Sequence, residues 1–325
     1  MIEFYKRNPV AQFFTIIVIM IAMWWPAFVH PQPMPENSEG VIYRSILWLL
    51  EGSAGLSVLF AFLLVGLEGF WFNLILYNCR LIPQNSLMPM LLYVVAMSSD
   101  PALATLTPLI LNNLLLLLVL HITLVRTELP MLNPSTLFVV SALLALATMV
   151  SPYAFYLLLF LVAVIVLFKL YSWREIMVAL LGFFAPYVIW LMCYYLTDGL
   201  DSAMQSIGVQ LGAFHIRIES ANWAIMSQNI YFGVLMVVSL MSFDSVRPRS
   251  LQVDNINSML IFVIFFCAIC NLFYGTLFPF NQRFFALPFA FVVSVFFVNM
   301  PKKIFWSILF TLYIAISIAA KYLVL

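Results

Sequence analysis

The chain has 325 residues, of which 65% are hydrophobic and 8% are charged, and its formal net charge is +1. A soluble globular domain devotes about a quarter of its residues to Asp, Glu, Lys and Arg, so this composition excludes one and indicates a protein surrounded by lipid. The nearly neutral charge, without a long basic patch, excludes nucleic acid as a partner. We expect one all-α integral membrane domain over residues 1–325, a polytopic bundle of transmembrane helices.

Polar breaks divide the chain into about eleven expected spans, because roughly 20 apolar residues cross a bilayer core. They lie near residues 10–28, 54–76, 87–98, 107–125, 136–150, 152–170, 176–196, 227–243, 257–275, 283–299 and 303–320. The first run is too long for a signal peptide, and Trp24, Trp25 and Pro26 replace the small residues of a cleavage site, so we interpret it as a retained span. Pro89 and Pro108 are expected to kink their helices.

The distribution of basic residues predicts the orientation of these spans. With a cytoplasmic N-terminus, ten of the fourteen Lys and Arg residues fall inside, and Arg44, Arg217, Arg283 and Lys321 fall outside. This excess follows the positive-inside rule, which predicts an outside C-terminus for an odd number of spans.

Two outer loops are long enough to hold further structure. Residues 29–53 contain Glu36 and Glu39 and then an amphipathic segment, 41–51, which predicts a juxtamembrane helix in the bilayer interface. Its expected apolar side comprises Val41, Ile42, Ile46, Leu49 and Leu50. Residues 197–226 form the larger outer loop, where apolar residues at helical spacing predict a second amphipathic helix.

Carboxylates on the outer side are the first candidates for chemistry. Glu36 and Glu39 could act as a general base or ligate a divalent metal, and the alternative is that they are simply solvated. Asp100, just before Pro101, is a second acidic candidate or else the N-cap of the next helix. No motif for ATP hydrolysis, dinucleotide binding or a zinc protease occurs, so we predict no resident cofactor. Cys267 and Cys270 lie in an apolar run and are interpreted as packing residues.

Basic residues on the outer side are candidates for substrate binding. Arg283, in LFPFNQRFFALPF, could clamp a phosphate bidentately at the start of a span. The other outer candidates are Arg217, His215 and His30. Each of them alone could instead be an anchor at the lipid headgroups.

Glu68 is an acidic residue placed well inside an expected span. A charge at that depth is costly, so the residue is expected to be functional or paired. Gly66 and Gly69 would let a neighbouring helix approach closely. The expected polar neighbours are His121, Asn73, Asn112 and Asn113. The two interpretations are ion coupling, or a protonated Glu68 that holds helices together through a hydrogen bond.

A cytoplasmic start, a first span and an outer loop with carboxylates and a juxtamembrane helix resemble the GT-C glycosyltransferases that use polyprenyl-phosphate sugars. The run from Ser141 to Trp190 is similar to their middle spans. The resemblance implies a polyprenyl-linked sugar as substrate, Glu36 or Glu39 as the base, Asp100 as a second acidic position and Arg283 as a phosphate contact. The adjacent acidic pair usual in that family is replaced here by two glutamates three residues apart.

The chain also resembles an uncharacterised Bacteroidota family of multipass inner-membrane proteins, through MIEFYKRNP, SSDPALATLTPLILNNLLLL and FNQRFFALPF. That resemblance implies a bacterial inner-membrane location and no activity. Three functions therefore stay open: a lipid-linked sugar transferase, a transporter or flippase using Glu68, and a non-catalytic subunit of a cell-envelope assembly. Membrane lipid is a partner in all three, and other membrane subunits in the last.

Overall fold

The computed structural model describes residues 9–31, 40–50, 53–83, 86–99, 105–124, 133–151, 157–196, 223–246, 261, 263–264, 267–268, 282–299 and 303–324. Within these ranges the chain is all-helical and contains no strand. The helices are α2 (Pro9–Val29), α3 (Val41–Leu50), α4 (Ala54–Asn78), α5 (Met88–Ser98), α6 (Pro108–Leu124), α7 (Pro134–Val150), α8 (Leu157–Leu167), α9 (Trp173–Leu196), α11 (Trp223–Val246), the 3-10 helix η3 (Gln282–Phe285), α13 (Ala286–Asn299) and α14 (Lys303–Val324).

The expected spans coincide with helices wherever the chain is described, and the span expected at 257–275 lies mostly outside the described residues. Five stretches of helix are long and apolar enough to cross a membrane: Pro9–Val29, Ala54–Asn78, Trp173–Leu196, Trp223–Phe243 and Gln282–Asn299. Helices α5, α6 and α7 are apolar but shorter. The chain is therefore a helical membrane protein, and the number of spans and their orientation stay predictions.

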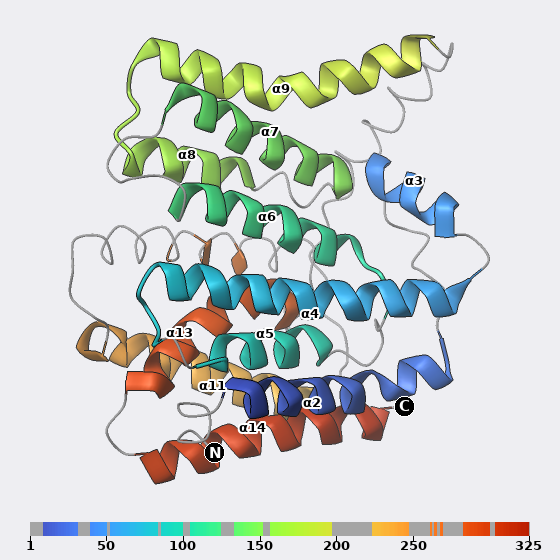
Figure 1. The fold of residues 1–325 in the computed structure, drawn as a ribbon, viewed down its shortest axis with the longest axis vertical. Coiled ribbons are helices and arrows are strands. Elements are labelled where there is room, and N and C mark those ends of the chain that lie inside the picture. Colours follow the sequence, from blue (N-terminus) through green and yellow to red (C-terminus); the bar gives the residue numbers. More distant parts are fainter. Residues whose placement is uncertain are drawn as a thin grey trace.

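The helices lie side by side in a tall stack, with α9 at one edge and α14 at the other (Figure 1). Helix α2 packs on α14, and the Tyr322 hydroxyl donates a hydrogen bond of 2.8 Å to the Ala22 carbonyl. The C-terminal end of α14 thus lies beside the second half of α2, and the two helices run in the same direction (Figure 1).

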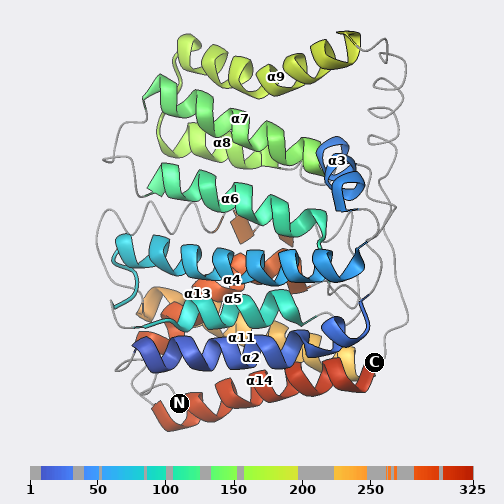
Figure 2. The ribbon, with the colours of Figure 1, turned by 45° about the vertical axis from the view of Figure 1, so that its right-hand side comes forward.

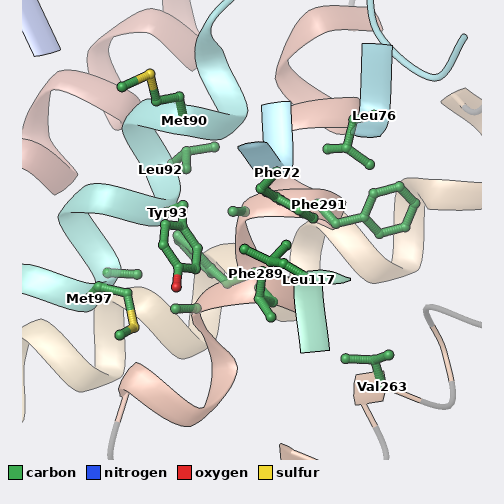
Figure 3. Close-up of a cluster of buried hydrophobic side chains, with 14 of the residues drawn as sticks. Phe72, Leu76, Met90, Leu92, Tyr93, Met97, Leu117, Val263, Phe289 and Phe291 are labelled. Carbon is green, nitrogen blue, oxygen red and sulfur yellow. The ribbon is translucent and has the colours of Figure 1, made fainter. Parts of the chain in front are cut away.

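Helices α5 and α13 form the centre of the core. Every residue of α5 is buried, and so is every residue of α13 except Asn299. The two helices pack on each other, and α2, α4 and α11 pack around them. Figure 3 shows side chains from α4, α5, α6 and α13 converging on this centre, and Phe289 stacks on Phe232 of α11 with ring centroids 3.9 Å apart.

The expected kinks at Pro89 and Pro108 are wrong. Pro108 is the first residue of α6, and Pro89 occupies the first turn of α5. Proline is tolerated there because the first N–H groups of a helix have no partner within the helix. The prolines inside described helices are Pro26 in α2 and Pro186 in α9.

The helix predicted for residues 41–51 is present as α3, and its place in the bilayer interface stays a prediction. It lies at one end of the bundle, at a steep angle to the neighbouring helices (Figure 2). Ile46 and Leu50 pack against the core as expected, but the most buried described side chain of α3 is Tyr43, which the predicted apolar side omitted. The Tyr43 hydroxyl donates a hydrogen bond of 2.6 Å to the Leu106 carbonyl and so ties α3 to the segment before α6.

Candidate functional site around helix α5

Three Asp, Glu, Lys or Arg side chains are buried among the described residues: Glu68, Arg283 and Lys321, with exposed fractions of 0%, 3% and 1%. The structure brings all three to α5. Glu68 is hydrogen-bonded to a residue in the middle of α5, and Lys321 is hydrogen-bonded to the last residue of α5. Arg283 belongs to η3, which packs on α5. Buried charge is costly in a membrane protein, so the surroundings of α5 are the candidate functional site.

Glu68 contacts α5 through a tyrosine. The Tyr93 hydroxyl donates a hydrogen bond of 2.6 Å to Glu68 Oε2, and Asn113 Nδ2 of α6 donates one of 3.3 Å to the Tyr93 oxygen. Glu68 Oε1 is buried without a hydrogen-bond partner among the described residues. One chain of polar groups therefore joins α4, α5 and α6.

Helix α4 approaches α5 closely at Gly69. A Cβ atom added to Gly69 would lie 3.1 Å from Val94 Cγ2 and 3.3 Å from the Met90 carbonyl oxygen, so this glycine permits the close approach that the sequence predicted. At Gly66 the neighbour is Met20 of α2, at 3.4 Å. The opposite side of α4 exposes large apolar residues to the surroundings. These are Leu56, Leu59, Phe60, Leu63, Leu67, Phe70 and Leu74.

The other intramembrane candidates do not contact Glu68 directly. Asn112 donates to the Ser151 hydroxyl at the end of α7, and the His121 ring meets the edge of Trp71 at 5.9 Å. Asn113 reaches the carboxylate only through Tyr93, which is not among the residues predicted from the sequence. A signal for it existed, since Tyr93 is the one titratable residue in the apolar stretch of α5.

Lys321 lies at the C-terminal end of α5 and has the clearest structural role of the three. Its Nζ donates a hydrogen bond of 3.1 Å to the Ser98 carbonyl and lies 5.5 Å from the centre of the Trp24 ring. Trp24 Nε1 in turn donates to Ser98 Oγ at 2.8 Å. A cation here complements the negative end of the helix dipole and satisfies a terminal carbonyl, so α2, α5 and α14 are joined at one point.

Arg283 differs from its expected setting in one respect. It lies just before α13, as expected for the start of a span, but it belongs to η3 and is buried instead of lying at the surface. Arg283 is buried because η3 packs on α5 and α13. The preceding residue of η3, Gln282, forms hydrogen bonds with α11. Gln282 Nε2 donates to Asn229 Oδ1 at 2.9 Å, and Gln228 Nε2 donates to Gln282 Oε1 at 3.4 Å.

The remaining predicted site residues are mostly not described. Glu36, Glu39, Asp100, His215 and Arg217 lie outside the described residues, so the closeness of Arg283 to the two glutamates stays a prediction. His30 is described and exposed, directly after α2. In the described part of the chain, no group of three or more His, Cys, Asp and Glu residues could hold a metal ion.

Comparisons with known proteins add no relative: no family model, no curated protein and no solved structure matches the chain. The contacts around α5, together with the sequence resemblance to GT-C enzymes, are therefore the basis for a functional proposal.

Proposed function

We propose that this protein is a GT-C-like glycosyltransferase of the bacterial inner membrane that uses a polyprenyl-linked sugar on the periplasmic side. The observation that supports this best is the pair of buried basic residues packed around α5. Lys321 contacts the last residue of α5, and Arg283 lies in the turn that packs on this helix. Basic groups inside an apolar bundle favour an anionic ligand, because burial strengthens their attraction to it.

Arg283 is the better phosphate contact of the two. A guanidinium presents a planar fork of N–H groups that matches two phosphate oxygens, and it stays charged in any protein environment. Its turn also precedes the first residues of α13, where the positive end of the helix dipole favours an anion. Lys321 adds a second positive charge beside the same helix.

The position of α3 supports a site at the C-terminal end of α5. Tyr43 ties α3 to Leu106, just before α6 begins, and α5 ends at Ser98 a few residues earlier in the chain. The juxtamembrane helix is therefore held near the chain segment that follows α5. In the proposal, the loop before α3 brings Glu36 or Glu39 to the sugar, where one of them deprotonates the acceptor hydroxyl.

Binding is tested on the full chain in lipid nanodiscs, with a fluorescent short-chain polyprenyl phosphate as the probe. We expect Arg283→Gln to weaken binding by about tenfold to a hundredfold, as the loss of a charge-assisted pair would. The matched control is Arg174→Gln, because Arg174 is exposed at the start of α9 and should leave binding unchanged. Equal affinity for the phosphate and for the neutral polyprenol would contradict the proposal.

Turnover is tested separately, by following transfer of a radiolabelled sugar from a polyprenyl-phosphate donor in membranes. Glu36→Gln or Glu39→Gln should abolish transfer and leave polyprenyl-phosphate binding nearly unchanged, since a base acts on the reacting group and not on the lipid. Transfer at the parental rate in both single variants and in the double variant would show that neither glutamate is the base.

A further inference from the structure

We propose that Glu68 is a proton-binding site inside the membrane bundle, where the Oε1 oxygen takes up and releases the proton and Tyr93 and Asn113 are positioning residues. This inference is independent of the proposed transferase, because the carboxyl lies in the middle of α4 and not at the end of α5. Glu68 is fully buried, and Tyr93 donates a hydrogen bond to one of its two oxygens. The ligand is the smallest cation, a proton.

The helices packed on α4 offer Glu68 no basic partner among the described residues. The helices with the main contacts to α4 are α2, α3, α5 and α6. Helix α2 has no titratable side chain, α5 has only Tyr93, and α6 has only His121. His121 is eight residues from Asn113, which is about 12 Å along α6 at roughly 1.5 Å per residue. Helix α3 contributes Tyr43, bonded to Leu106, and Arg44, which is exposed.

A bare carboxylate at this position would thus be a buried charge without a counter-ion among the described residues. Proteins meet such a case by neutralising the group, and a proton on the carboxyl does this without moving a helix. On α4 itself the other titratable group is Tyr77, nine residues further along. Nothing in the described surroundings replaces the proton as the balancing charge.

The direction of the hydrogen bonds assigns the oxygen that binds the proton. Asn113 Nδ2 can only donate, so the Tyr93 oxygen accepts from it and the phenol hydrogen is directed to Glu68 Oε2. Oε2 then accepts this hydrogen bond whether the carboxyl is protonated or ionised. The proton therefore binds at Oε1, which has no partner among the described residues. Uptake forms the Oε1–H bond with a proton from water, release returns it to water, and no electrons are transferred.

Close packing keeps the carboxyl in place. Gly69 lets α4 approach α5 until a Cβ atom at this position would lie 3.1 Å from Val94, and Phe72 packs beside Tyr93 with ring centroids 6.2 Å apart. The carboxyl is thus held between helices and cannot turn to lipid headgroups as a surface glutamate would. The bond from Tyr93 fixes which oxygen remains for the proton.

Infrared spectroscopy tests the inference directly, because a protonated carboxyl has a carbonyl stretching band that the carboxylate lacks. Spectra of the full chain in nanodiscs would be recorded over a pH series, and those of Glu68→Gln subtracted at each pH. We expect one carboxyl band that disappears as the pH rises and returns when it falls. A band that persists at every pH, or one that is absent at every pH, would overturn the proposal.

Two controls separate proton binding at Glu68 from titration of a surface carboxyl and from binding of a metal cation. Glu175→Gln removes a carboxyl that contacts Ser172 near the start of α9, so its difference spectrum should not contain the band assigned to Glu68. Tyr93→Phe should shift the frequency of the Glu68 band, and this shift assigns the band even if Glu68→Gln fails to fold. Loss of the band on adding sodium at constant pH would overturn the proposal in favour of a metal-cation site.

Discussion

Helices α13 and α9 are both apolar, yet they occupy opposite environments. Both are apolar enough to cross a membrane, but 83% of the residues of Gln282–Asn299 are buried, whereas 17% are buried in the most apolar 18-residue window of α9. Apolar composition therefore does not decide burial in this protein, and α9 is the less buried of the two helices. It forms the edge of the stack, while α13 lies at the centre beside α5 (Figure 1).

The difference shows what replaces the hydrophobic effect in this protein. Lipid solvates an apolar side chain as well as a protein core does, so hydropathy does not pull α9 inward. What holds a helix in place is close packing and polar contact. Helix α9 packs on α7, and its buried residues are Ala179, Gly182 and Phe183, whereas α13 is buried along nearly its whole length.

The largest effect on stability is expected from a substitution where α9 packs most closely on α7. A Cβ atom at Gly182 would lie 2.5 Å from Ser141 Oγ and 2.6 Å from the Phe138 carbonyl oxygen, so Gly182→Leu must push α9 away from α7. We expect a loss of about 3 kcal/mol in the free energy of unfolding, at the upper end of overpacking costs. Steric-trapping measurements in bicelles would check this. Gly55→Leu is the control, since nothing lies within 4 Å of that position, and an equal loss there would contradict the argument.

Replacing a large side chain by alanine compares α13 and α9 directly. Phe289 is fully buried against Phe232 and Tyr313, whereas Phe184 of α9 is 55% exposed. Phe289→Ala should cost about 2 kcal/mol, less than the same change in a water-soluble core because lipid also accommodates the side chain. Phe184→Ala should change the free energy of unfolding very little. Similar costs for the two variants, measured by the same steric trapping, would mean that α9 is covered by another part of the protein.

Removal of the Tyr93 hydroxyl tests the hydrogen bonds that join α4, α5 and α6. Tyr93→Phe deletes the donor to Glu68 Oε2, while Oε1 of this fully buried carboxyl already lacks a partner among the described residues. We expect a loss of about 1.5 kcal/mol, near the largest value for a single hydrogen bond between membrane helices. Thermal unfolding in detergent would measure it. If Glu68→Gln had the same effect on stability with and without Tyr93→Phe, the two residues would not be coupled.

The smallest effect is expected from the equivalent substitution on α9. The Tyr187 hydroxyl and Thr148 Oγ1 are 2.6 Å apart, and Thr148 also donates to the Ala145 carbonyl at 2.6 Å. Tyr187→Phe therefore leaves the threonine hydroxyl with an acceptor, and we expect a loss of about 0.6 kcal/mol, the typical value for such a bond. The same thermal assay would rank the two tyrosines. A larger loss for Tyr187→Phe than for Tyr93→Phe would reverse the ranking of the two regions.

Apolar run length by itself determined most helices of this protein. A run of about 20 apolar residues must satisfy its backbone hydrogen bonds internally, so helix is the available structure and polar breaks set the ends. The amphipathic pattern of residues 41–51 likewise predicted α3. Glu68 and Gly69 were recognisable as inward-facing because a charge and a missing side chain both require a neighbouring helix.

The partners of those residues were decided only by the tertiary structure. When both faces of a helix are apolar, as in α4, periodicity carries no information about which neighbour packs on which face. Nothing in the pattern could therefore select Tyr93 for Glu68 in place of His121. The same holds for the burial of Arg283 and Lys321, which depends on how η3 and α14 pack in the bundle, and for the exposure of α9, because lipid and protein interior accept its side chains equally well.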